Sequence, residues 1–154
     1  MQQSTKADFK IFDAKKYRVG IVVAQFNRDI TEELLKSAGN KLSEYGVLVN
    51  KISVHRVAGS VEIPVVLKAL AETKKFDCLV AIGVVIRGDT PHFDYVCKMV
   101  SDGVLRVMMD YGLPVGFGVV TTENAEQAMA RLHVGGEASE AALQTARIVK
   151  EVRK

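Results

Sequence analysis

Cysteine is scarce in this sequence, and so are long apolar runs and charge of one sign. The only cysteines are Cys78 and Cys97, which are not in CxxC spacing and have no pair of histidines near them. This argues against a zinc site and against a disulfide, so we expect two buried thiols. No linker, internal repeat or low-complexity segment divides the 154 residues. The length therefore predicts a single domain, residues 1–154.

The net charge of +3 is small and dispersed, and no basic block has interleaved aromatic residues. A nucleic-acid partner is therefore not expected. The longest uncharged run, residues 111–122, is far shorter than the ~18 residues that a membrane span needs, so we expect no membrane association. Residues 1–10 have neither the apolar core nor the cleavage pattern of a secretory signal. These absences favour a cytoplasmic protein.

Two apolar periods alternate along the chain. Short β-branched runs predict strands over residues 18–25, 47–57, 77–86 and 114–120. Apolar residues at helical spacing predict helices over residues 29–45, 62–74, 92–110, 123–133 and 138–152. Asp29 and Glu32 form a capping pair for the first helix, which Gly46 is expected to end. Gly135 and Gly136 are expected to separate the last two helices.

The repeated order of strand and helix predicts an α/β fold in three layers, with a four-stranded parallel sheet and helices on both of its faces. In such sheets the ligand crevice lies outside the carboxyl ends of the strands. The segments that leave the predicted strands are residues 25–27, 58–62, 84–92 and 117–122. Candidate site residues are therefore expected in these segments.

The turn after the third strand, residues 87–92 (RGDTPH), crowds polar chemistry between an apolar strand and a helix. Gly88 permits backbone conformations that other residues resist, and Pro91 suits the first position of a helix. The free N–H groups of Gly88, Asp89 and Thr90 could bind an anion such as phosphate. The spacing is not that of a Walker motif, so a capped turn without a ligand stays open. Asp89 favours that alternative, because its carboxylate repels phosphate and caps helices well.

Other candidates are also ambiguous when each is taken alone. His92 begins the third predicted helix, where it could carry protons or have a structural role. His55 and His133 are expected to be surface or capping residues. Phe26 follows the first strand, where its ring could stack on a planar ligand or complete the core.

The segment of residues 59–62 could bind the hydroxyls of a polyol or cap a helix. Arg131 could bind an anion or complement the dipole at the C-terminal end of its helix. No nucleophile–base pair stands out and no cluster has metal-ligand spacing, so no metal site is expected. Together the strand exits offer an aromatic ring, hydroxyl partners, an anion site and one histidine.

Four blocks of sequence, in order, carry a resemblance to a known family. They are AQFN (residues 24–27), GSVEIP (59–64), GVVIRGDTPHFDYV (83–96) and PVGFGVVTTENAEQAMAR (114–131). Over about residues 18–131 the chain resembles the 6,7-dimethyl-8-ribityllumazine synthases of riboflavin biosynthesis. The resemblance implies a flavodoxin-like fold. It also implies a transferase that condenses 5-amino-6-(D-ribitylamino)uracil with 3,4-dihydroxy-2-butanone 4-phosphate and releases phosphate and water. Such chemistry needs proton movement rather than an electron sink, so no cofactor is expected.

The resemblance also implies roles for individual residues. His92 is the implied catalytic residue, which moves protons. The residues implied to bind the ribitylaminouracil are Phe26, Ser60, Val61, Glu62, Val84, Val85, Ile86 and Phe117. The residues implied to bind the butanone phosphate are Asp89, Thr90 and Arg131. In this scheme Phe26 stacks on the pyrimidine, and Arg131 makes a charge-assisted pair with the phosphate.

The resemblance implies that the site lies between adjacent subunits of a homopentamer, with Phe117 and Arg131 reaching in from the neighbour. Whether pentamers pair into decamers or close into a sixty-subunit shell stays open, as does an association with riboflavin synthase. Residues 1–12 are expected to form an N-terminal arm. Its alternating DFKIF segment, residues 8–12, is expected to pair with the sheet edge of a neighbour. A frayed tail is the alternative.

Three positions depart from the family pattern. Ser60 replaces a common alanine, and Asp89 stands where Ala or Glu is common. Residues 132–136 are shorter than in many relatives, and Gly135 stands in the place of a lysine. The Asp89 and Gly135 departures leave open an idle protein that binds flavin or lumazine without capturing phosphate. A signalling or electron-transfer module is disfavoured, because the acidic phosphorylation cluster and the Ser/Thr-rich first loop of such modules are missing.

Overall fold

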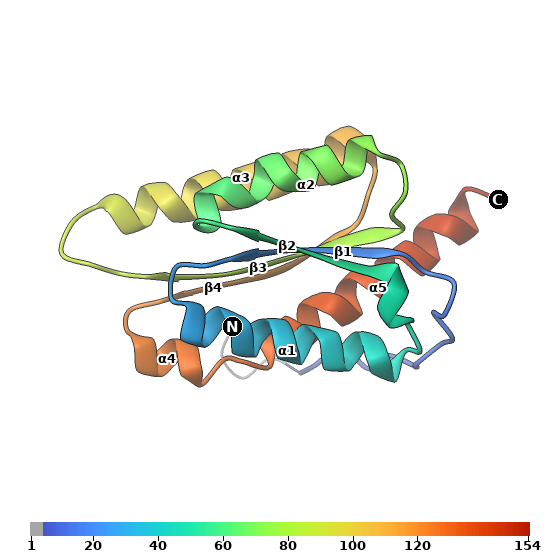
Figure 1. Cartoon of the computed structure of the whole chain (residues 1–154), viewed down its shortest axis with the longest axis horizontal. Helices are drawn as coiled ribbons and strands as arrows, with labels where there is room; N and C mark the ends of the chain where they lie inside the picture. Colours follow the sequence, from blue (N-terminus) through green and yellow to red (C-terminus); the bar gives the residue numbers. More distant parts are fainter. Residues whose placement is uncertain (1–4) are drawn as a thin grey trace.

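The computed structural model describes residues 5–154, which form a parallel sheet between two layers of helices (Figure 1). The strands are β1 (Val19–Ala24), β2 (Ile52–Val57), β3 (Cys78–Ile86) and β4 (Val115–Thr122). The helices are α1 (Arg28–Glu44), α2 (Ile63–Glu72), α3 (His92–Tyr111), α4 (Ala125–Met129) and α5 (Val134–Val152). The predicted three-layer α/β fold with four parallel strands is confirmed.

The strand order in the sheet is β2-β1-β3-β4, and every neighbouring pair is parallel. The inner strands β1 and β3 are apolar and almost wholly buried, as expected for strands that are covered on both faces. The outer strands β2 and β4 form the two edges. Because all strands run the same way, their carboxyl ends meet at one end of the sheet, on the left in Figure 1.

The helical layers bury alternate residues of each inner strand in two apolar clusters. Helices α1, α4 and α5 lie on one face, and α2 and α3 lie on the other (Figure 1). On the first face Leu34 and Leu143 pack against β3 residues such as Val80. On the second face Leu67 and Val104 belong to the cluster that covers the opposite side of the strands.

The second strand is shorter than predicted. We expected a strand over residues 47–57, but β2 begins at Ile52 and follows a 3₁₀ turn at Val49–Lys51. Val47 is buried, yet its N–H donates to Leu42 O at 3.0 Å. This apolar residue therefore belongs to the turn that ends α1, because a local backbone hydrogen bond has replaced the strand pairing that its side chain suggested.

The predicted capping pair of the first helix is wrong. The N-cap of α1 is Asn27, which has a left-handed backbone (φ 58°, ψ 48°) and makes no side-chain cap hydrogen bond. Glu32 instead accepts hydrogen bonds of 2.9 and 3.1 Å from Arg56 on β2. The end of the helix is as predicted, because Gly46 follows it with a φ of +78°.

The predicted separation of the last two helices at Gly135 and Gly136 is also wrong. The helix predicted over residues 123–133 is only α4, and α5 begins at Val134 and contains both glycines. A Cβ on Gly135 would overlap the backbone carbonyl of Leu34 in α1. The glycines therefore permit a close approach of α1 and α5 rather than a break between helices.

The described part of the predicted arm, residues 5–12, packs against its own chain. Gln144 Nε2 donates to Lys10 O at 2.9 Å, and the rings of Phe12 and Tyr45 meet edge to face with centroids 5.2 Å apart. These contacts anchor residues 10–12, so a frayed tail is the wrong description of them. Pairing with a neighbour's sheet stays a prediction, and residues 1–4 lie outside the described residues.

Both cysteines are free, Cys78 in the core and Cys97 half-buried on α3. Burial raises the pKa of both thiols, which keeps them protonated and unreactive. The prediction of two buried thiols is confirmed for Cys78, whereas Cys97 is only half-buried. In residues 5–154, no helix combines the length and the apolar character that crossing a membrane requires.

Candidate active site

At the carboxyl end of the sheet, β3 extends beyond β1. The pairing of β3 with β1 ends at Val23 and Ile82, whereas its pairing with β4 continues to Ile86 and Thr122. Residues 83–86, about 13 Å of strand, therefore have a partner strand only on the β4 side. Their backbone groups on the β1 side face the space beyond the end of β1. This overhang offers hydrogen-bonding groups to a ligand in the crevice.

Phe26 lies directly after β1, beside this overhang. Its side chain is 69% exposed, so the alternative that it completes the core is wrong. Its backbone N–H donates to Ala58 O at 3.0 Å, which joins the exits of β1 and β2. The next residue, Asn27, has the left-handed backbone described above. Asparagine tolerates this conformation, which directs the chain from β1 into α1 and leaves the Phe26 ring on the surface.

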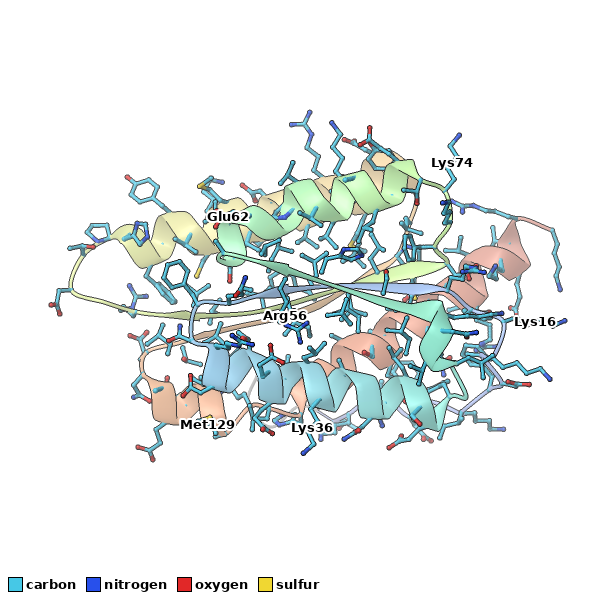
Figure 2. The ribbon with its side chains drawn as sticks, in the orientation of Figure 1. Lys16, Lys36, Arg56, Glu62, Lys74 and Met129 are labelled. Carbon is cyan, nitrogen blue, oxygen red and sulfur yellow. The ribbon has the colours of Figure 1, made fainter. Side chains whose placement is uncertain are left out.

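Residues 59–62 form a tight turn between β2 and α2. Glu62 Oε1 accepts a hydrogen bond of 3.0 Å from Gly59 N, so the capping role that the sequence left open is present. Figure 2 shows Glu62 at the start of α2, with its side chain near the surface. Val61 is half-buried. Ser60 is 6% exposed, and its Oγ has no hydrogen-bond partner within residues 5–154.

The turn between β3 and α3 differs from the expectation in two details. Gly88 does not have a positive φ and has open space around its Cα, so no special conformation explains this glycine. Pro91 is the N-cap of α3 rather than its first residue. Asp89 and Thr90 are exposed, and the Asp89 carboxylate makes no hydrogen bond to the helix in the described chain. Nothing therefore supports the alternative of a turn capped by Asp89.

The backbone N–H groups of Gly88, Asp89 and Thr90 have no protein acceptor within residues 5–154. They lie before a helix of 20 residues, whose dipole favours an anion at this end. His92 is the first residue of that helix and is exposed. Its backbone N–H donates to Thr90 Oγ1 at 3.4 Å, and its imidazole makes no hydrogen bond within the described chain. Phe26 and residues 59–62, 83–86 and 88–92 are named the exit cluster below.

Two predicted site residues do not belong to the exit cluster. Phe117 is 41% exposed on the outer strand β4, opposite Ala81. It precedes the end of β4 by five residues, or about 16 Å, so its expected position at the strand exit is wrong. Arg131 follows α4 and is exposed on the α1–α5 side of the sheet. Phe117, residues 119–121 and Arg131 are named the β4 surface below.

Arg131 interacts with its own helix. Its Nη1 donates to Gln127 O at 2.8 Å, so the role at the helix C-terminus that the sequence left open is present. Arg131 also lines a groove of about 860 Å³ between β4, α5 and the N-terminal arm. A second groove, of about 550 Å³, lies between α1 and the start of α5 and is lined mainly by charged side chains. Figure 2 shows Met129 of α4 on the opposite side of the sheet from Glu62.

The remaining candidates have ordinary surroundings. His55 Nε2 lies 3.2 Å from Ser53 Oγ on β2, and His133 is the exposed N-cap of α5. Both positions agree with the predicted surface or capping roles. Within residues 5–154, no three side chains of His, Cys, Asp or Glu are grouped so that they could hold a metal ion.

Sequence reasoning missed the roles of Gly83 and Arg87, which shape the exit cluster. A Cβ on Gly83 would lie 2.5 Å from Ser60 Oγ, so only glycine lets the turn of residues 59–62 pack onto β3. A Cβ on Gly59 would lie 2.8 Å from Phe26 Cδ2. Arg87 Nε donates to Glu123 Oε2 at 2.9 Å across two strand exits. A glycine within a strand pattern is a known sign of close approach, but the partner of Arg87 is far away in sequence and left no signal.

Known proteins match this chain over most of its length. A family model described as 6,7-dimethyl-8-ribityllumazine synthase matches residues 16–150. A relative of that name from Parabacteroides distasonis is 42% identical over 151 residues, covering 96% of this chain and 94% of its own. A relative of the same name from Coxiella burnetii is 42% identical over 141 residues, covering 88% of this chain and 93% of its own. The matched residues include both the exit cluster and the β4 surface.

Proposed function

The chain belongs to the 6,7-dimethyl-8-ribityllumazine synthase family, and from this premise we propose how its two groups of site residues carry out the reaction. The protein is a transferase of riboflavin biosynthesis. It condenses 5-amino-6-(D-ribitylamino)uracil with 3,4-dihydroxy-2-butanone 4-phosphate and releases phosphate and water. We place the reaction in the cytoplasm and treat residues 1–154 as one domain with an N-terminal arm.

The overhang of β3 beside an exposed phenylalanine is the observation that carries the site assignment. A flat heterocycle with polar edges needs a ring to stack on and fixed backbone groups to pair with. Phe26 offers the ring, and the backbone groups of Val84 and Ile86 face the unpaired side of β3. The backbone of Val85 faces β4 instead, because successive residues of a parallel strand bond to opposite sides and both Leu79 and Arg87 donate to the β4 side, so Val85 is left with its side chain for any contact. Ser60, Val61 and Glu62 border the same space, where they bind the ribityl chain and the edge of the ring.

The phosphate of the second substrate binds at the start of α3. The backbone N–H groups of Asp89 and Thr90 are free there, and the helix dipole attracts an anion. The exposed Asp89 carboxylate does not oppose this assignment, because only its backbone N–H needs to face the phosphate. His92 lies next to the same N–H groups, close to the bonds that form and break.

The reaction joins the amine of the pyrimidine to the ketone carbon, and loss of water gives an imine. Phosphate then leaves by β-elimination, which gives an enol that tautomerises to a ketone. The ribityl-bearing nitrogen attacks this ketone, and loss of a second water closes the ring. Each step moves protons, which His92 carries between substrate atoms and solvent. General acid–base help of this kind is worth typically about 10²–10⁴-fold. Holding two reactants in register contributes up to roughly 7–11 kcal/mol in ideal cases. Positioning is therefore the larger contribution, and no cofactor is required.

The family forms oligomeric assemblies, and we propose a homopentamer for this chain. Phe117 is separated from the overhang by about 7 to 17 Å along the sheet, since it lies opposite Ala81 while the overhang begins at residue 83 and ends at residue 86. Arg131 lies on the opposite helical face from Glu62. Both residues therefore complete the site of a neighbour, where Phe117 contacts the ring and Arg131 pairs with the phosphate. Decamers, a sixty-subunit shell and association with riboflavin synthase would be later steps of the same assembly.

At position 135, where many relatives have a lysine, this chain has no side chain that could take over a contact with the phosphate. Gly135 packs against the backbone of α1, so no side chain fits there. Phosphate binding therefore rests on Arg131 and the N–H groups of α3. If these were insufficient, the protein would bind lumazine or flavin without turnover.

A direct assay tests this proposal. Purified protein is mixed with both substrates, and the fluorescence of the lumazine product is followed. The expected result is turnover above the spontaneous rate. Binding of the product without turnover would support the idle binder and contradict the proposal. Mass photometry of the same sample measures the assembly, and a monomer at assay concentration would contradict the shared site.

A further inference from the structure

Arg87 occupies the junction of three segments around the start of α3. It directly follows β3, and its backbone N–H donates to Thr122 O at 2.9 Å. This bond extends the pairing of β3 with β4 by one step beyond Ile86 and Thr122. The main chain is therefore fixed to β4 at the point where it turns toward α3.

The side chain of Arg87 joins the other two segments. Nε donates to Glu123 Oε2 at 2.9 Å, in the turn between β4 and α4. Nη1 lies 3.5 Å from Asp94 Oδ1, in the first turn of α3. The guanidinium carbon lies 4.3 Å from the ring centroid of Phe93, where cation–π attraction holds it. One planar side chain thus contacts two carboxylates and one ring on two different elements.

Glu123 is a firm partner, because its turn is braced by its own hydrogen bonds. Gln127 Oε1 accepts from Glu123 N at 2.8 Å, and Gln127 N donates to Asn124 Oδ1 at 2.9 Å. The same Gln127 accepts the hydrogen bond from Arg131 through its carbonyl oxygen. Arg87 is therefore attached, through the Glu123 carboxylate, to a turn whose backbone is held by its own hydrogen bonds.

These contacts bracket the segment with the free N–H groups. The backbone of Arg87 fixes its start, and the contacts of the Arg87 side chain with Phe93 and Asp94 fix its end. Exposed ion pairs contribute little to folding stability, so stability alone is a weak reason for this arrangement. The two carboxylates also occupy the guanidinium, which argues against its use as a direct phosphate ligand.

We propose that Arg87 is a positioning residue, which holds the first turn of α3 against the β4–α4 turn and thereby sets the geometry of the N–H groups of residues 88–90. This inference rests on the proposed function, because it takes the substrate phosphate as the ligand of those groups. Arg87 itself does not touch the substrate. Loss of its contacts therefore weakens binding of the phosphate substrate and leaves binding of the pyrimidine nearly unchanged.

Two substitutions distinguish the shape of the Arg87 guanidinium from its positive charge as the property that phosphate binding needs. Arg87→Met and Arg87→Lys are both expected to raise KM for the butanone phosphate roughly tenfold, since small displacements of binding groups are costly. KM for the pyrimidine is expected to stay within about twofold. The inhibition constant of inorganic phosphate should rise in parallel. Lysine is not expected to rescue, because it cannot pair with both carboxylates and stack on Phe93. Full rescue by lysine would overturn the proposal in favour of simple charge neutralisation.

A substitution of Glu123 separates positioning from direct phosphate binding. If Arg87 positions the turn, Glu123→Ala weakens phosphate binding in the same way as Arg87→Met, and the double variant is no weaker than either single variant. If Arg87 were a direct ligand, Glu123→Ala would free its guanidinium and tighten phosphate binding. Glu126→Ala controls for the loss of one negative charge on α4, and Lys98→Met controls for the loss of an exposed ion pair on α3. Neither control should change the KM for phosphate.

The outcomes also separate this inference from the proposed function. A wild-type protein without turnover refutes the proposed function, and titration with inorganic phosphate still reports on Arg87. Turnover in the wild type together with an unchanged KM in Arg87→Lys and Glu123→Ala refutes this inference alone. Circular dichroism at the assay temperature verifies that each variant is folded. If Arg87→Met unfolds, the lysine and Glu123 variants decide the matter.

Discussion

The exit cluster and the β4 surface hold the site residues of one chain, but different kinds of structure build them. The exit cluster consists of strand ends, tight turns and the start of a long helix, so it offers mainly backbone groups. The β4 surface is the edge of the outer strand and the end of a short helix, so it offers side chains, Phe117 and Arg131. The exposed Phe26 ring and the Arg131 guanidinium therefore lie in different regions of the chain.

This difference supports the proposal that the site is completed by a second copy of the chain. Backbone groups at strand ends are fixed by the sheet, and they can be aligned within a single chain. An arginine that must close over the phosphate can come from outside, provided that an interface orients it.

The largest predicted effect concerns the contact between α1 and α5, which lies outside both regions. Gly135→Ala places a Cβ against the backbone of Leu34, and overpacking of this kind costs about 3 kcal/mol of unfolding free energy. Gly39→Ala is the matched control, because Gly39 is also helical and has nothing within 4 Å of its added Cβ. The control should stabilise the protein by up to about 1 kcal/mol. Urea unfolding measures both, and equal effects would contradict the packing role of Gly135.

The next largest effect concerns the exit cluster. His92→Ala should lower kcat about a hundredfold, near the low end for general acid–base groups. The reaction should remain measurable, because the positioning of the two substrates is unchanged. Steady-state fluorescence kinetics measures the loss. A fall to the spontaneous rate, with both substrates still bound, would show that proton transfer contributes more than positioning.

A smaller effect is predicted for the β4 surface. Arg131→Ala removes a charge-assisted hydrogen bond, which should raise KM for the butanone phosphate roughly tenfold. The KM for the pyrimidine should change little. Arg106→Ala is a control, because Arg106 is an exposed arginine on α3 that pairs only with Asp110 among the described residues. If KM for the phosphate substrate were unchanged in Arg131→Ala, Arg131 would have no part in the anion site.

The smallest effect concerns the ion pair between Arg56 on β2 and Glu32 on α1. The hydrogen bonds from Arg56 lower the pKa of Glu32 below its ordinary value. The pair therefore stabilises the fold above the ordinary pKa of 4.5, and the contribution is lost as the pH falls through the lowered value. Glu32→Gln should cost less than about 1 kcal/mol at neutral pH, since the pair is near the surface.

The measurement is urea unfolding of Glu32→Gln at neutral and at acidic pH. Glu33→Gln is the matched control, because the neighbouring Glu33 is exposed and has no ion pair within residues 5–154. A cost that stayed constant with pH would show that the carboxylate charge of Glu32 is not the cause.

Most of the exit cluster could be predicted from the sequence, because strand exits follow from apolar periods alone. Phe26, residues 59–62 and the start of α3 lie where the pattern of strand and helix puts them. The β4 surface could not be placed in this way. The apolar pattern predicts that the fourth strand ends at residue 120 and that the strand exit covers residues 117–122. In the structure β4 continues to Thr122, so Phe117 lies within the strand rather than at its exit.

Errors at the helices have a common physical cause. Gly135 and Gly136 were read as helix breakers, since glycine is a poor helix former. In the structure the backbone of α1 approaches them so closely that tertiary packing overrides this propensity. The role of Arg87 was missed for a similar reason, because its partner Glu123 is 36 residues away in sequence. Contacts between distant segments leave no periodic signal in a single sequence.

Subunit mixing tests the central claim, that each site combines the exit cluster of one copy with the β4 surface of another. One variant carries Phe26→Ala and His92→Ala, and the other carries Phe117→Ala and Arg131→Ala. With the butanone phosphate well below its KM, each is expected to have at most about a tenth of the wild-type activity alone. Refolded together in equal amounts, they should regain activity, because about one quarter of the sites then combine two intact halves. The claim would be contradicted if the two variants assembled into mixed oligomers and the activity of the mixture were still no higher than the average of the separate variants.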